Sequence, residues 1–196
     1  MPRPTTRPAL LAGLALALVP LTGCAGADAG PAGAGGPPPP EKPFGQSCAA
    51  LPADGPGSLD SMSGIPVLAA IEQSKDLTTL AKLVKTAKAK DVFDSMDNVT
   101  VFAPDDAAFA KLPDDQRKAL DTQQGASDLL RRLIVVRDLK KNDMTDKAYT
   151  SLQGAVLKAS GTGDDYRIGG ARVLCGSIRT ANARLATLDQ VPAFGG

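Results

Sequence analysis

The chain of 196 residues contains no histidine and no tryptophan, and aromatic residues make up only 4% of it. Without histidine, a Ser-His-Asp triad, a Cys-His dyad and a histidine-based zinc site are excluded. The scarce aromatic residues leave little surface on which sugars or nucleotide bases would stack. We therefore expect no catalytic residue, no metal site and no cofactor. An enzyme that uses only Asp and Lys stays open as a third function class.

The chain also lacks a surplus of positive charge, since 22 basic residues stand against 21 acidic ones. Arg3 and Arg7 lie in an N-terminal segment that we expect to be removed, which leaves 20 basic and 21 acidic residues in the mature chain. Binding to nucleic acid depends on basic residues that displace counterions from the phosphates. Nucleic acid is therefore not an expected partner.

No hydrophobic run is long enough to span a bilayer. Residues 9–19 are apolar apart from Gly13, and the run reaches roughly 14 residues when it is extended to Thr22, below the ~18–20 that a transmembrane helix needs. A short apolar run behind Arg3 and Arg7 is typical of an export signal. We assign residues 1–23 to a signal peptide.

Residues 21–24, with the sequence LTGC, resemble a bacterial lipobox, in which an apolar residue and two small residues precede a cysteine. The small residues let a signal peptidase close around an extended backbone, and the Cys24 thiol is the nucleophile that takes a diacylglyceryl group. Two or three acyl chains, such as palmitate, anchor a protein stably where one chain does so only marginally. This pattern predicts lipidation of Cys24 and a location on the extracytoplasmic face of the cell membrane. The alternative is an ordinary secretory signal with a coincidental cysteine.

If Cys24 is lipidated, two of the three cysteines remain, Cys48 and Cys175. An even pair of cysteines outside the cell predicts a disulfide. It would close a loop of about 127 residues, which the chain-entropy model values at about 5 kcal/mol. The alternative is two free, buried thiols.

Residues 24–43, which begin at the lipidated cysteine, consist almost only of Ala, Gly and Pro. Such a composition cannot bury enough apolar surface to offset the entropy of ordering, so we expect a disordered tether. One folded domain is expected over residues 44–194, because about 150 residues bury roughly two-thirds of their surface.

Hydrophobic periodicity predicts helices in the first half of this domain and strands in the second. Asp76 is the expected N-cap of a helix with an apolar stripe. The expected helices are residues 66–74, 77–87, 105–111, a helix from 114, and 127–133. The expected strands are residues 99–102, 134–136, 155–159 and 166–168 as a hairpin, 171–175 and 185–191. Helices followed by a strand meander predict an α+β fold.

Two segments resemble the signatures of the fasciclin domain, also called the β-Ig-h3 domain. Residues 98–113 (NVTVFAPDDAAFAKLP) are similar to the first signature, and residues 180–191 (TANARLATLDQV) are similar to the second. Residues 152–154 (LQG) and 173–176 (VLCG) are similar to small actinobacterial fasciclin proteins that are secreted or lipid-anchored. The resemblance covers about residues 44–194. It implies a single α+β domain, a mixed β wedge or sandwich with helices packed around it.

The resemblance implies structural roles for the first signature. Pro104 ends a buried strand, and Asp105 or Asp106 caps the short helix that follows. Phe109 in this helix packs inward. Asp106 stands where the family usually has asparagine.

The second signature and the segment between the two are interpreted in the same way. Asn182 is expected in a left-handed turn between strands, and Asp189 as a carboxylate that accepts backbone hydrogen bonds, with a ligand contact as the alternative. Many fasciclin domains have a Tyr-His pair that is linked to cell adhesion in animals. Leu133 and Ile134 occupy the matching positions here, so an integrin-type role is not transferred.

These patterns together predict a non-catalytic lipoprotein that adheres to, or interacts with, a surface protein, matrix or cell-wall polymer. The membrane is the second expected partner, reached through the lipid anchor. The alternative is a carrier or sensor of an apolar small molecule or lipid, bound in a groove between helices and sheet.

Overall fold

The computed structural model describes residues 41–195. The predicted signal peptide, Cys24 and most of the predicted tether lie outside the described residues. Within residues 41–195, no helix is long and apolar enough to cross a membrane.

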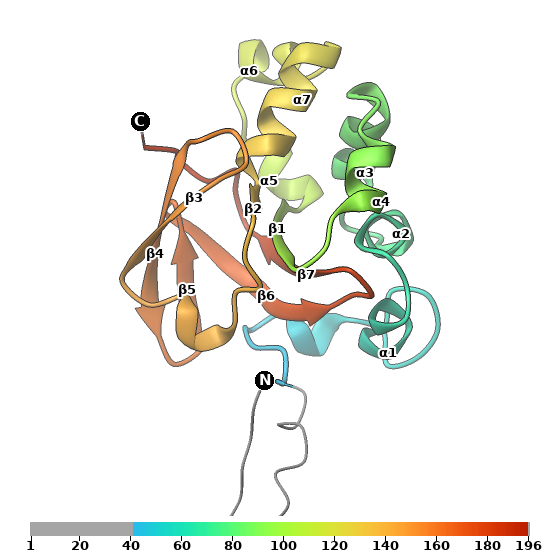
Figure 1. The fold of residues 1–196 in the computed structure, drawn as a ribbon, viewed down its shortest axis with the longest axis vertical. Helices are drawn as coiled ribbons and strands as arrows, with labels where there is room; N and C mark the ends of the chain where they lie inside the picture. The colour runs from blue at the N-terminus through green and yellow to red at the C-terminus, as the bar shows by residue number, and fades with distance from the viewer. Residues whose placement is uncertain (1–40, 196) are drawn as a thin grey trace, which may run out of the picture. The chain divides into compact units, whose positions relative to one another are not determined.

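Helices dominate the first two-thirds of the described residues. The α-helices are α1 (Leu59–Ser63), α2 (Val67–Gln73), α3 (Thr78–Thr86), α4 (Lys90–Ser95), α5 (Asp106–Ala110), α6 (Asp114–Ala119) and α7 (Gln123–Arg132). Two 3₁₀ turns are η1 (Cys48–Ala50) and η2 (Lys141–Asp143). Figure 1 shows α2 to α7 grouped on one side of the fold, beside the strands.

The strands form one mixed sheet of seven, in the order β2-β1-β7-β6-β5-β4-β3. They are β1 (Val99–Pro104), β2 (Ile134–Val135), β3 (Lys147–Thr150), β4 (Val156–Thr162), β5 (Asp165–Ile168), β6 (Ala171–Arg179) and β7 (Ala183–Leu188). Only β1 and β7 pair in parallel; the other neighbours are antiparallel. A bridge between Val135 and Ser151 brings the chain after β3 against β2, so the sheet nearly closes into a barrel. The α+β fold is confirmed.

The apolar stripe predicted for the 77–87 segment is buried, as its helical spacing indicates. Its residues, Leu77, Leu80, Ala81, Val84 and Ala87, are at most 8% exposed. Lys82 and Lys85 on the opposite face are exposed. The 3.6-residue period therefore identified both the helix and the face that packs in the core.

Several predicted boundaries differ from the structure, and those of α7 and β7 have a clear cause. Helix α7 begins at Gln123 rather than at residue 127, because the Thr122 hydroxyl accepts a hydrogen bond from Gly125 N at 3.1 Å and caps it. Strand β7 begins at Ala183 and ends at Leu188, since it pairs with β1 over that length. Helices α1 and α4 were not predicted, because their apolar patterns are too short to show a helical period.

Strand β1 continues through Pro104 instead of ending before it. Phe102 N donates to Leu133 O on the β2 side, and Asp105 N donates to Leu188 O in β7. Backbone N–H groups along a strand alternate in direction, so an N–H at position 104 would face the β2 side, as that of Phe102 does. Proline has no N–H, and β2 pairs only with Thr100 and Val101. No ladder hydrogen bond is lost, so proline is tolerated at this end of the strand.

Candidate functional site

The two signature segments lie side by side at the centre of the sheet. Strands β1 and β7 pair in parallel from Val99 opposite Ala183 to Pro104 opposite Leu188. Asn98 N donates to Asn182 O at 3.1 Å just before this pairing begins. The parallel register brings equivalent ends of both signatures together, and so builds one structural unit from segments about 80 residues apart.

The two aspartates of the first signature serve different helices. Asp105 accepts a hydrogen bond from Ala108 N at the start of α5, at 2.6 Å. Asp106 turns to α3 and accepts hydrogen bonds from Thr78 N (3.2 Å), Thr78 Oγ1 (2.7 Å) and Thr79 N (2.7 Å). The prediction that Asp76 caps α3 was therefore wrong. The carboxylate comes from a distant segment, because α5 packs against the start of α3.

The Asp106 carboxyl is held in its charged form. Partial burial acts to raise its pKa, but the hydrogen bonds from Thr79 and Thr78 together outweigh burial and hold the pKa below the ordinary value of 3.8. A carboxylate that accepts several hydrogen bonds is stabilised in the ionised state. The charge also lies at the N-terminal end of α3, where the helix dipole favours it.

Asn182 connects three elements through its side-chain amide. Its Oδ1 accepts from Val67 N at the start of α2 (2.9 Å), and its Nδ2 donates to Phe93 O and Met96 O at the end of α4 (both 3.1 Å). The predicted left-handed backbone at Asn182 was wrong, since the left-handed asparagine is Asn98, with φ 54°. Asn182 is placed by these hydrogen bonds and not by a turn preference.

Asp189 and Phe109 lie at the other end of the signature unit. Asp189 Oδ1 accepts from Arg172 N at 2.8 Å, and Asp189 N donates to Arg172 O at 3.1 Å. Phe109 is 2% exposed. Both residues therefore make contacts that hold elements together.

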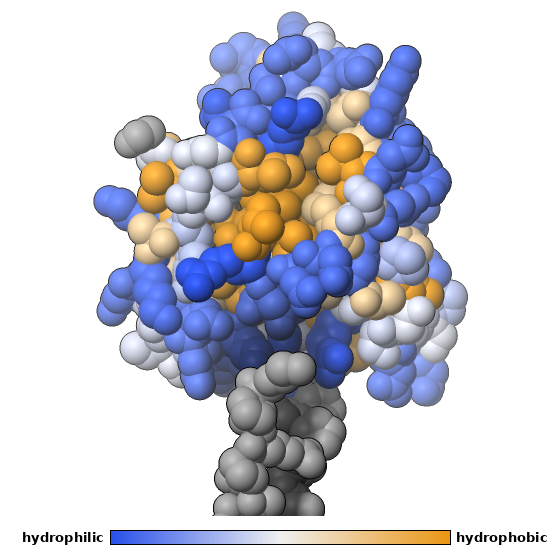
Figure 2. Space-filling model, viewed as in Figure 1, coloured by the Kyte–Doolittle hydropathy of each residue, from blue (hydrophilic) through white to orange (hydrophobic). Residues whose placement is uncertain are grey.

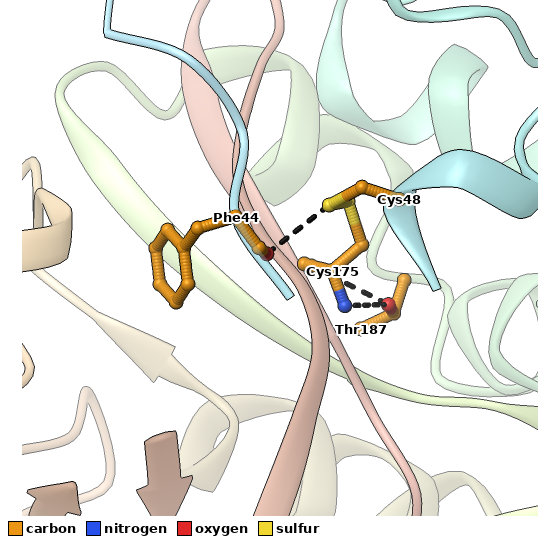
Figure 3. Close-up of a disulfide and its surroundings, with 4 residues drawn as sticks. All are labelled: Phe44, Cys48, Cys175 and Thr187. Atoms are coloured by element: carbon orange, nitrogen blue, oxygen red, sulfur yellow. Dashed lines mark hydrogen bonds between the residues drawn. A yellow bond between two sulfur atoms is a disulfide. The ribbon is translucent and has the colours of Figure 1, made fainter. Parts of the chain in front are cut away.

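The N-terminal strap, residues 41–51, crosses β6. Phe44 exchanges two backbone hydrogen bonds with Gly176, and Ser47 N donates to Leu174 O. A disulfide joins Cys48 to Cys175 beside these bonds (Figure 3), with the Cα atoms 4.8 Å apart. A Cβ at Gly176 would lie 2.5 Å from the Phe44 ring, so glycine permits the close approach.

An ionic group around the buried Arg184 ties the start of the strap to β7. Arg184 is 8% exposed and donates from Nε to Asp138. Its Nη1 lies 3.5 Å from Glu41 Oε2, and Glu41 Oε1 accepts from Lys141 N at 3.0 Å. This ionic group was not predicted from the sequence. An arginine within an otherwise apolar strand was the available signal, because a buried charge requires partners.

Exposed apolar side chains lie next to the β2 edge. Val136 is 61% exposed and Leu152 is 45% exposed. Each directly follows a residue of the Val135–Ser151 bridge, and we call these two residues the apolar edge. Figure 2 shows apolar side chains gathered on this face of the molecule, over the region where Figure 1 places β1 and β2.

The positions that match the family's Tyr-His pair are buried. Leu133 is 0% and Ile134 is 1% exposed, so neither side chain is available to a partner in this conformation. Among residues 41–195, no cluster of three or more His, Cys, Asp or Glu residues is placed to hold a metal ion.

Residues 75–191 match the fasciclin domain family. The chain belongs to the fasciclin family. The match includes both signatures and the strands β1 and β7 that they form. The resemblance of the two signature segments is thereby confirmed.

Mycobacterial fasciclin proteins are among the relatives of this chain. The immunogenic protein MPB70 of Mycobacterium bovis is 33% identical over 148 residues, which cover 73% of this chain and 76% of that protein. The cell surface glycolipoprotein MPT83 of Mycobacterium tuberculosis is 32% identical over 155 residues, or 76% of this chain and 70% of that protein. This chain is therefore related to a cell-surface lipoprotein.

The chain is also similar to a solved FAS1 domain pair from the insect cell adhesion molecule fasciclin I. The identity is 17% and the TM-score is 0.48. The similar region covers 60% of this chain and 45% of the insect chain.

Proposed function

We propose that this protein is a non-catalytic interaction module, held on the outer face of the cell membrane by lipid on Cys24. The lipobox and the tether composition support the anchor, and the name of the relative MPT83 supports the location. The partner is a surface protein, a matrix component or a cell-wall polymer.

The observation that carries the proposal is the apolar edge. Val136 and Leu152 leave much of their side chains in water, although burial of such side chains is favourable by about 25 cal/mol per Å² of apolar surface. Apolar side chains gathered at the surface, as Figure 2 shows on this face, mark candidate contact sites for other molecules. The contact differs from the animal Tyr-His mode, because Leu133 and Ile134 are buried here.

The test displays the full-length protein on lipid vesicles and measures their retention on isolated cell walls and on matrix-coated surfaces. Vesicles that carry an unrelated lipoprotein provide the baseline. We expect retention above this baseline, and we expect Val136→Asp to remove most of it by placing a charge at the contact. Ala49→Asp, which changes an exposed alanine in η1, is the matched control and should bind like the parent. Retention no higher than the baseline, or an equal loss in both variants, contradicts the proposal.

A carrier role for a small molecule is the second candidate, favoured by a cavity of about 200 Å³ with both apolar and polar lining residues. Sites for drug-sized ligands usually have about 300–1,000 Å³. The cavity therefore favours a small molecule over a lipid.

A further inference from the structure

The two end strands of the sheet, β2 and β3, leave an open edge between them. They meet at the Val135–Ser151 bridge. Beyond this bridge the chain after β2 is held to β1, because Thr100 Oγ1 donates to Arg137 O at 2.7 Å and accepts from Leu139 N at 2.9 Å. The chain therefore departs from β3 instead of continuing to pair with it.

The backbone of Ala148 in β3 faces this open edge. Ala148 lies opposite Lys158 in β4, and Lys158 O accepts from Gly169 N at 2.8 Å on the β5 side. Opposed residues of an antiparallel pair exchange both hydrogen bonds or neither, so the N–H and C=O of Ala148 point away from β4. Within residues 41–195, neither group has a backbone hydrogen-bond partner. Such an edge is a template for another extended chain.

A cavity of about 490 Å³ lies along this edge, with lining from residues 137–139 and from β3. Its charged lining residues, all at least partly exposed, are Arg137, Asp138, Asp143 and Lys147. Asp138 pairs with Arg184, and Asp143 pairs with Lys147 at 3.6 Å. Among the ion pairs of residues 41–195, none includes Arg137. An occupant of this cavity therefore meets one positive charge that is free to pair with a carboxylate.

The apolar edge borders the same opening, since Val136 directly precedes Arg137. Val136 is 61% exposed and Leu152 is 45% exposed, so both offer surface to an occupant. A chain that pairs with β3 directs alternate side chains to opposite faces, and apolar side chains on one face can cover these two residues. A row of alternating N–H and C=O groups is a property of a polypeptide, which favours a peptide over a polysaccharide or a lipid as the occupant.

We propose that an extended peptide segment of a partner protein, with alternating apolar and acidic side chains, adds to the sheet at Ala148 and places a carboxylate at Arg137. This inference rests on the proposed interaction role and selects a protein among its partner classes. In strand addition, main-chain hydrogen bonds supply the affinity, and the side chains beside the edge supply the specificity.

The test measures the fluorescence anisotropy of labelled peptides with the full-length protein in detergent micelles. A peptide of alternating valine and glutamate should bind saturably. A peptide of alternating valine and glutamine should bind about two- to fivefold more weakly, the range that an exposed ion pair supplies. The first peptide is also prepared with N-methyl groups on every second amide, in the two possible sets. One set should weaken binding about tenfold, because a methylated amide cannot donate to Ala148 O.

Variants of the protein separate backbone pairing from charge. Ala148→Pro removes only the N–H that points away from β4, a place where a strand tolerates proline, and should weaken binding about tenfold. Ala148→Val keeps this N–H and should bind like the parent. Arg137→Gln should give the two unmethylated peptides equal affinity, whereas Lys118→Gln, an exposed residue of α6 outside the cavity lining, should preserve their difference. The thermal midpoint of each variant checks its fold.

Several results overturn strand addition. They are the absence of saturable binding with every peptide, equal affinity of the parent and Ala148→Pro, and equal affinity of the unmethylated peptide and both methylated sets. Self-association of the parent that Ala148→Pro abolishes would place a second copy of this chain at the edge, and overturns the assignment to a partner.

The proposed function fails or stands separately in the vesicle experiment. If Val136→Asp removes vesicle retention while Ala148→Pro is retained like the parent, strand addition is wrong and the interaction role stands. If the peptides bind as expected while retention stays at the baseline, the interaction role is wrong and the strand edge stands as a peptide site.

Discussion

Asp106 shows how one side chain connects two helices that are distant in the sequence. It belongs to the first turn of α5, yet its carboxylate accepts three hydrogen bonds from Thr78 and Thr79 in α3. N-terminal N–H groups of a helix have no partner within the helix, so a capping acceptor stabilises it. Asparagine, usual in the family at this position, offers the acceptor without the charge.

This arrangement predicts a pH-dependent contribution of Asp106 to stability. Because the pKa of Asp106 is lowered in the folded state, its stabilisation is complete above the ordinary value of 3.8 and is lost as the pH falls through the lowered pKa. Asp106→Ala should lower the free energy of unfolding at pH 7 by about 1–2 kcal/mol. Urea unfolding followed at several pH values between 7 and 2 measures both effects.

Asp106→Asn is the control for charge. Its amide oxygen still accepts at one of the two positions, but its Nδ2 cannot accept from the N–H group at the other. We expect this variant to unfold at pH 7 between the parent and Asp106→Ala, and to lose less stability at acid pH than the parent. If parent and Asp106→Asn lose stability equally as the pH falls, the carboxylate does not contribute in the way its contacts indicate.

At the scale of elements, the strap is held to β6 at an irregular part of that strand. The pairing of β6 with β7 shifts in register on both sides of Cys175, and Ser177 has a φ of 56°. A bulge of this kind releases backbone groups from the ladder, and Gly176 uses its N–H and C=O to pair with Phe44. The disulfide therefore reinforces a contact that backbone hydrogen bonds also make.

Removal of the disulfide should destabilise the domain without abolishing its fold. In the chain-entropy model, a cross-link across 127 residues contributes about 5 kcal/mol at most, and native strain or residual structure reduces this value. Cys48→Ala combined with Cys175→Ala should lower the denaturant midpoint, while the circular dichroism spectrum in water stays close to that of the parent.

The same measurement on the parent protein with and without a reductant controls for the substitutions. Reduced parent and double variant should unfold at similar midpoints. Coincident unfolding curves for oxidised parent and double variant would show that the cross-link adds nothing.

At the scale of the whole molecule, the proposed location depends on lipidation of Cys24, which lies far from the disulfide in the sequence. Cys24→Ala should move the protein from the membrane fraction to the medium or the soluble envelope fraction, because no acyl chain is attached. Fractionation of the producing bacterium and intact-mass analysis of the natural product provide the measurement.

The folded part supplies the control for this experiment. Cys24→Ala should keep the Cys48–Cys175 disulfide and the thermal midpoint of the parent, since both cysteines of this disulfide lie within the folded residues 41–195. A natural product without acyl mass, or a Cys24→Ala variant that stays in the membrane fraction, contradicts the anchor.

Particular residues show how far local patterns reach. The α3 stripe and the 155–168 hairpin were predicted because their periods and turn residues are local properties. The cap of α3 and the role of Asn182 were predicted incorrectly, since each depends on partners 27 or more residues away. Secondary-structure propensity describes only the local conformational preference of a residue, and contacts with distant segments override that preference.

The amino-acid sequence by itself determined the exclusion of histidine chemistry, the α+β class and the fasciclin signatures, because these depend on residue identity and local spacing. The export signal with its lipobox is a prediction from the same kind of local pattern. Only the tertiary structure decided which aspartate caps which helix and which arginine is buried. It also decided that Leu133 and Ile134 lie in the core, that Val136 is exposed, and that Ala148 faces an open edge of the sheet. These features arise when segments distant along the chain pack together, and no local pattern contains that arrangement.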